Sequence, residues 1–115
     1  MKYKKSTEKI KLLKQEFKQY LIYLYPNISK RTIMTYLCDA FYVYRHNSEF
    51  KIDFFDLFVN KQHIIDFEFE LLKQQMSRVN IIKPKSSTKA YINGLNRLYM
   101  FFNDKYGGVN NFINQ

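Results

Sequence analysis

Apolar side chains recur at intervals of three and four residues along almost the whole chain, which is the spacing of one face of an α-helix. The first stretch of this kind carries Ile10, Leu13, Phe17, Leu21 and Leu24. Pro26 and Asn27 end it, and comparable stretches follow. Three glycines and two prolines among 115 residues are too few for a chain dominated by loops. The pattern predicts one domain with an all-α fold, a compact bundle of four to five helices.

Helix boundaries follow from capping side chains and helix-breaking residues. The residues expected to cap helix N-termini are Ser6 or Thr7, Ser29, Asn60, and Ser86 or Ser87. Residues 52–59 are expected to form a helical turn or an irregular connection, and residues 77–87, with Pro84, a loop. Gly107 fits a helix C-terminal cap, followed by a frayed tail. The expected organisation is therefore a basic N-terminal arm over residues 1–7, a helical domain over 8–106, and a tail or start of an interdomain linker over 107–115.

The charge of the chain is large and unevenly spread. Nineteen Lys and Arg face ten Asp and Glu, which leaves a net charge of +9. Residues 47–72 hold six of the acidic and only two of the basic residues, so both flanking segments are strongly basic. Such polarisation favours a polyanion as the partner of one side of the fold.

Basic and amide side chains form a stripe on two of the expected helices. With the apolar residues of the second helix inward, the outward side chains are Arg31, Thr35, Tyr42 and Arg45, with Lys30 beside the helix start. On the last helix they are Lys89, Asn93, Asn96, Arg97 and Met100. Lys85 and Ser87 stand at the start of that helix, where free N–H groups favour phosphate. Asn and Arg one turn further along can hydrogen-bond base edges, so the alternatives are a nucleic-acid surface and a plain solvated face.

The sequence offers no catalytic motif. It contains no HExxH, GxxxxGK[ST] or GxGxxG pattern, and His46 and His63 lie in different segments, where surface or capping roles are expected. Asp66 and Glu70 share a helix face and could in principle ligate a metal, but a solvated acidic face is favoured. Cys38 is expected to pack as a small apolar side chain. We therefore expect no active site, metal or cofactor.

Compartment and membrane association follow from the same sequence. The first five residues lack the apolar stretch of a secretory signal, and no apolar run approaches the ~20 residues that cross a bilayer. One cysteine excludes an internal disulfide framework. A cytosolic protein without membrane contact is expected.

The order of short motifs resembles the core-binding domain of tyrosine recombinases, or phage integrases, the SAM-like N-terminal module of that family. The matching residues, over roughly 8–106, are Phe17-x-x-Tyr20-Leu21, Ser29-x-x-Thr32-x-x-x-Tyr36-x-x-Asp39, Val59-Asn60-x-x-x-Ile64-x-x-Phe67, Ser87-Thr88, Ile92-Asn93-Gly94-Leu95, Leu98-Tyr99 and Phe101-Phe102.

This resemblance implies a SAM-like fold that forms one half of a clamp around double-stranded DNA in site-specific recombination and DNA integration. Two helices of that domain, over residues 29–45 and 87–104 here, would approach the major groove. The DNA-binding residues it implies are Lys30, Arg31, Thr35, Lys85, Ser87, Lys89, Asn93 and Arg97. The family's catalytic tyrosine belongs to a separate C-terminal domain of the full-length protein, so this chain alone is expected to be non-catalytic and monomeric.

Two other functions stay open. Small helical bundles often bind proteins, and exposed side chains such as Tyr42 and Met100 would then matter more than the lysines. A standalone regulator of a mobile genetic element is the other possibility.

Overall fold

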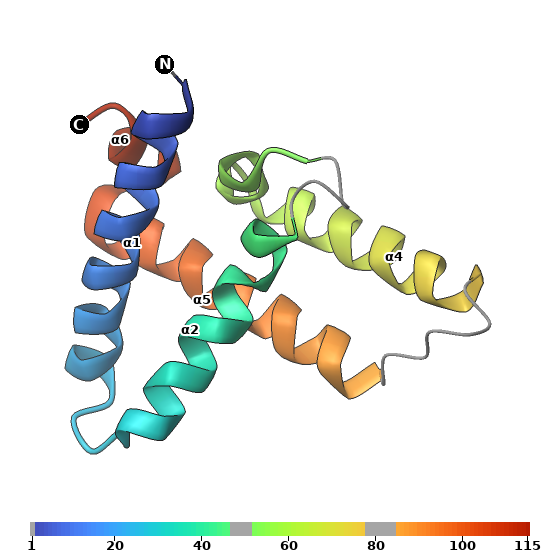
Figure 1. Ribbon diagram of the computed structural model, residues 1–115, viewed down its shortest axis with the longest axis horizontal. Coiled ribbons are helices and arrows are strands. Elements are labelled where there is room, and N and C mark those ends of the chain that lie inside the picture. The colour runs from blue at the N-terminus through green and yellow to red at the C-terminus, as the bar shows by residue number, and fades with distance from the viewer. Residues whose placement is uncertain (1, 47–51, 78–84) are drawn as a thin grey trace.

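The computed structural model describes the backbone of residues 2–46, 52–77 and 85–115, and the side chains of residues 8–46, 52–73 and 88–115. The described chain is all-α, as predicted, with five α-helices and one short 3-10 helix (Figure 1). These elements are α1 (Lys2–Leu24), α2 (Lys30–Arg45), η1 (Phe54–Phe58), α4 (Lys61–Ser77), α5 (Lys85–Tyr106) and α6 (Val109–Ile113). Within the described residues, no helix has the length and apolar character needed to cross a membrane.

Capping side chains begin three of these elements. Ser29 Oγ accepts the amide of Thr32 at 3.1 Å, and Asn60 Oδ1 accepts the amide of His63 at 3.1 Å, so both expected caps are confirmed. Residues 52–59 contain η1, whose first turn is capped by the Asp53 side chain.

Two other expected caps are wrong. Helix α1 already begins at Lys2, so Ser6 and Thr7 lie inside it and residues 2–7 belong to the helix. Helix α5 begins at Lys85, which places Ser86 and Ser87 inside its first turn. A Ser or Thr side chain can cap a helix only where the helix begins. Lysines, which favour helix, flank both hydroxyl pairs, so the helical pattern continues across these residues.

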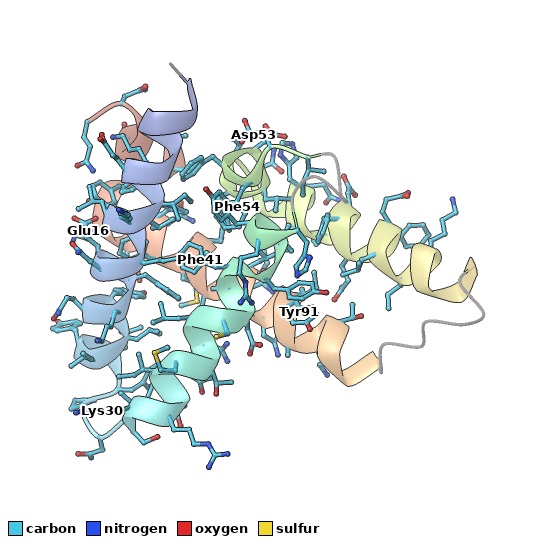
Figure 2. The ribbon with its side chains drawn as sticks, in the orientation of Figure 1. Glu16, Lys30, Phe41, Asp53, Phe54 and Tyr91 are labelled. Carbon is cyan, nitrogen blue, oxygen red and sulfur yellow. The ribbon has the colours of Figure 1, made fainter. Side chains whose placement is uncertain are left out.

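Phenylalanine side chains from all six described elements fill the core. Six of them are at most 2% exposed: Phe17, Phe41, Phe58, Phe101, Phe102 and Phe112. The Phe17 ring contacts the Phe41 and Phe101 rings edge to face, at centroid distances of 6.4 and 5.9 Å. The Phe41 ring also contacts the Phe54 ring, so the aromatic contacts continue from α2 to η1 (Figure 2). Edge-to-face ring pairs add to the apolar area that the core buries.

Helices α2 and α5 cross at their closest point between Ala40 and Gly94. A Cβ atom on Gly94 would lie 2.6 Å from the Ala40 amide nitrogen and 2.7 Å from the carbonyl carbon of Asp39. Ala40 is itself fully buried. The two backbones therefore touch directly, and this crossing admits no side chain at position 94.

Polar contacts join α1 to the end of α5. The Tyr20 hydroxyl donates to Asp104 Oδ2 at 2.6 Å, and the Tyr106 hydroxyl donates to the Glu16 carboxylate, which also lies 3.4 Å from Lys105 Nζ. Burial, with the neighbouring carboxylates, raises the pKa of both phenols, so both stay protonated as hydrogen-bond donors.

The C-terminal residues are not a frayed tail. Gly107 has a φ of +73°, and the Gly107 and Gly108 amides donate to the carbonyls of Asn103 and Phe102, each at 3.0 Å. This reversal turns the chain back, so that α6 buries Val109 and Phe112 against the core. Lys9 Nζ on α1 then reaches the Phe112 carbonyl at 3.1 Å. Sequence reasoning missed α6 because five residues are too short to show a helical period.

We predict that Gly94→Ala destabilises the fold by about 1–3 kcal/mol, although Ala is the better helix former by about 1 kcal/mol. The reason is the clash of the new methyl group with the α2 backbone. Urea unfolding followed by circular dichroism measures the difference, with the exposed Asn103→Ala on the same helix as the control. A Gly94→Ala variant as stable as the parent would show that the helices do not pack this closely.

We also predict that Phe112→Ala lowers the free energy of unfolding by about 3–5 kcal/mol, the usual range for a fully buried ring. The neighbouring Ile113→Ala, at a partly exposed position, should cost much less. Thermal unfolding of the two variants distinguishes a packed α6 from a loose tail, for which both substitutions would have small and similar effects.

Candidate nucleic-acid interface

Ring contacts on both sides of the α2–α5 crossing hold the two basic helices together. One turn from Gly94, the Arg97 guanidinium lies over the Tyr36 ring with its Cζ 3.8 Å from the ring centroid. In the opposite direction, the Tyr42 and Tyr91 rings stack with centroids 3.7 Å apart and an interplanar angle of 2°. Figure 1 shows the N-terminal ends of α2 and α5 toward the same, lower edge of the view. The crossing and its flanking rings thus give the outer surfaces of the two helices a defined relative position.

On α2, the expected contact residues are exposed near the start of the helix. Lys30, Arg31 and Thr35 all have exposed side chains, and Lys30 lies at the outer end of the helix in Figure 2. Thr35 Oγ1 donates to the Arg31 carbonyl at 3.1 Å, which leaves the hydroxyl oxygen able to accept. The first turn holds no acidic residue, so its positive dipole end and these cations add in sign.

On α5, Lys89 and Asn93 are exposed, whereas Arg97 is half-buried. Stacking on Tyr36 covers one face of the guanidinium, but the N–H donors lie in the plane of the group, at its edge, where stacking does not engage them. Lys85 and Ser87 fall in the first turn of α5, and their side chains lie outside the described residues. Among the eight predicted residues, the structure therefore gives side-chain positions for six.

One carboxylate lies within this basic surface. Burial raises the pKa of Asp39, while the nearby Arg97 guanidinium lowers it to a smaller extent. Asp39 is the only acidic residue of α2. Its charge offsets part of the positive field of Arg97.

Two side chains near this surface differ from expectation, and a third was missed. Tyr42 was expected to point outward, but it is half-buried against Tyr91. Cys38 was expected to pack internally, yet it is exposed, and its carbonyl accepts a hydrogen bond from Arg45 Nη2 at 3.1 Å. Met34 was not singled out, although it is 56% exposed on α2. The burial of Tyr42 follows from the packing of α2 on the core with one face and on α5 with another, of which sequence periodicity shows only the first.

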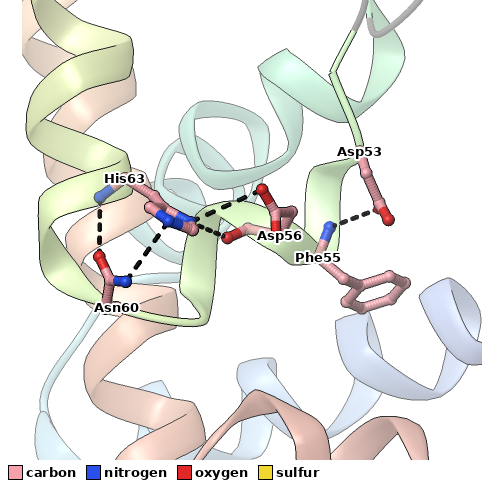
Figure 3. A network of polar contacts seen from close by, with 5 residues as sticks. All are labelled: Asp53, Phe55, Asp56, Asn60 and His63. Carbon is pink, nitrogen blue, oxygen red and sulfur yellow. Dashed lines mark hydrogen bonds and ion pairs between the residues drawn. The ribbon is translucent and has the colours of Figure 1, made fainter.

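Five of the nine Asp and Glu residues with described side chains lie around η1 and along α4, whereas α2 and α5 carry one each, Asp39 and Asp104. His63 approaches the Asp56 carbonyl at 2.7 Å and the Asp56 carboxylate at 3.6 Å, both measured from Nδ1 (Figure 3). Asp66 and Glu70 line the same hollow as Asp56. Across the part of the chain that the structure describes, no three His, Cys, Asp or Glu side chains are arranged to hold a metal ion.

Comparisons with known proteins add no family to this geometry. No protein-family model, curated protein or solved structure matches the chain.

We predict that Asp39→Asn is more stable than the parent protein at neutral pH. Because its folded pKa is raised, Asp39 binds its proton more tightly in the folded state, so parent stability falls as pH rises through the interval between the ordinary and the raised pKa. The difference should vanish in acid, below the ordinary carboxyl range. Urea unfolding across pH tests this, with the exposed Glu70→Gln as control. Equal parent and Asn stabilities at all pH values would contradict it.

Proposed function

We propose that the chain binds double-stranded DNA through the outer surfaces of α2 and α5. The observation that carries the proposal is the segregation of charge over one compact body. Exposed Lys30, Arg31 and Lys89 lie on the two helices that cross at Gly94, while four carboxylates gather around η1 and α4. A polyanion such as DNA would then meet the α2–α5 side first.

The described residues on this side supply two kinds of contact. Lys30, Arg31 and Lys89 suit phosphate oxygens, which fix register and supply most of the salt-dependent affinity. Asn93 and Arg97 suit base edges, with Arg97 prepositioned by its contact with Tyr36. Thr35 can bond either a phosphate or a base edge.

We further propose that this DNA contact is one half of a recombinase clamp, with catalysis in a separate domain. Its support is the order of sequence motifs that resemble the SAM-like core-binding domain of tyrosine recombinases. The two helices that would approach the groove in that family correspond to α2 and α5, which are in close contact here.

A protein-binding role has one specific observation in its favour. Met34 and Met100 are 56% and 54% exposed on α2 and α5, and flexible Met side chains are common at adaptable protein interfaces. Tyr42, by contrast, is occupied by its stack on Tyr91. DNA affinity distinguishes the two roles, because a protein interface built on methionines does not need the cations.

We predict that the double variant Arg31→Ala/Lys89→Ala binds a ~25-bp duplex at least about tenfold more weakly than the parent, and that the slope of log K against log salt decreases in magnitude by about two. Fluorescence anisotropy over a salt series measures both quantities. The matched control is Lys61→Ala/Lys73→Ala on α4, which removes the same charge from the acidic side and should change affinity much less.

Three results would contradict this prediction. Equal losses in the two double variants would indicate a response to net charge alone. An unchanged Arg31/Lys89 variant would move the contact surface away from α2 and α5. Absence of binding at low salt would exclude DNA as a ligand of this chain and leave the protein-binding role.

A further inference from the structure

A hollow of about 340 Å³ lies between η1 and α4. Its floor is apolar, formed by Ile52, Leu57, Phe67 and Leu71. Its walls carry four carboxylates, those of Asp53, Asp56, Asp66 and Glu70. No Lys or Arg is among the described residues that line it, and His63 is the only lining side chain able to carry positive charge. A surface of this kind repels DNA and suits an apolar stem that ends in a cation.

The carboxylates are partly engaged but remain accessible. Asp53 accepts the Phe55 amide at 3.1 Å, and Asp66 accepts the Gln62 side-chain amide at 2.9 Å. These neutral donors leave the negative charge in place, and Figure 3 shows the Asp53 and Asp56 side chains on either side of η1. Each carboxylate keeps lone pairs for a further donor.

The outer surface of α4 beside these carboxylates is apolar. Ile65 is 49% exposed and Phe69 is 67% exposed. Phe69 lies one turn from Asp66 and directly before Glu70, so the apolar and acidic side chains belong to one continuous surface of the helix.

The outer face of α1 has the complementary composition. Lys11, Lys18 and Ile22 share one face of this helix and are all exposed, whereas Lys14 lies over the Phe41 ring of α2. Within the described residues, Lys11 and Lys18 make no hydrogen bond, ion pair or ring contact. Figure 1 shows α1 and α4 on opposite sides of the molecule, so one chain cannot bring these two surfaces together by itself.

We propose that the acidic hollow and the exposed face of α4 dock the lysine-bearing face of α1 from a second copy of this chain. Lysine stems would lie over the apolar floor while their ammonium groups meet the carboxylates, and Ile22 would cover Phe69. The two surfaces lie on opposite sides of the molecule, so the contact is head-to-tail and repeats from copy to copy. The argument is independent of the DNA-binding proposal, because it uses a different side of the fold.

The net charge of +9 opposes such a contact only at long range. At physiological ionic strength the Debye length is about 8 Å, which screens the repulsion between whole molecules more than the attraction between touching groups. Association should therefore be weakest in very low salt, improve at physiological salt, and decline again when salt screens the ion pairs themselves.

The test is sedimentation equilibrium of the full chain without DNA, at physiological salt and up to about 1 mM protein, where even a Kd near millimolar populates dimers. Two charge-reversed proteins are compared with the parent: Asp66→Lys/Glu70→Lys in the hollow, and Lys11→Glu/Lys18→Glu on α1. Each alone should associate at least about tenfold more weakly. Mixing the two should restore association, since lysines in one hollow then face glutamates on the other α1.

The control is Lys30→Glu/Lys89→Glu, which makes the same charge change as the α1 variant but on the α2–α5 side, and should leave self-association intact while weakening DNA binding. The Asp66→Lys/Glu70→Lys variant should lose self-association and keep DNA binding. The experiment therefore tests the two proposals independently. A monomeric parent protein would overturn the self-docking proposal, as would reversed variants that associate normally or a mixture that stays dissociated. A monomeric parent that binds a synthetic basic amphipathic peptide through Asp66 and Glu70 would assign the hollow to another protein instead.

Discussion

The direct contact between the backbones of α2 and α5 at Ala40 and Gly94 determines the arrangement around it. Only a position without a side chain allows the helices to approach this closely. The approach brings Tyr36 under Arg97 on one side of the crossing and Tyr42 onto Tyr91 on the other. Both ring contacts would open if the helices moved apart. The geometry of the basic surface therefore depends on a residue that carries no charge.

The aromatic core extends this rigidity to the rest of the fold. Phe41 joins α2 to η1 through Phe54, and Phe102 joins α5 to α6 through Phe112. These connections tie the basic helices and the acidic η1–α4 side into one body. Because the charges are separated across one rigid body, the molecule has a dipole moment that is fixed relative to the fold. A flexible basic chain of the same net charge would lack such a fixed dipole.

The sequence predicts correctly those features that depend on residues a few positions apart. It predicts poorly the features that depend on which distant element packs alongside. The caps at Ser29 and Asn60 involve residues three apart, so the sequence contains the whole interaction. The burial of Tyr42, the exposure of Cys38 and the docking of α6 depend on which distant element lies alongside, which no local pattern encodes. Six of the eight predicted contact residues have described side chains, and five of these are exposed, with Arg97 half-buried. Their role in binding DNA stays a prediction, as does the SAM-like identity.

In the proposed interface, the half-buried Arg97 and the exposed lysines would make different kinds of contact with DNA. An exposed lysine such as Lys89 loses much side-chain freedom when it binds, and its contact with phosphate carries no sequence information. Arg97 has already lost part of that freedom on Tyr36, so its planar donors would bind at a smaller entropic cost. The negative charge of Asp39 offsets part of the positive field of this arginine, while the guanidinium keeps its donors. Arg97 is thereby better suited to directional hydrogen bonding than to attraction of phosphate at a distance, which falls to the exposed cations around it.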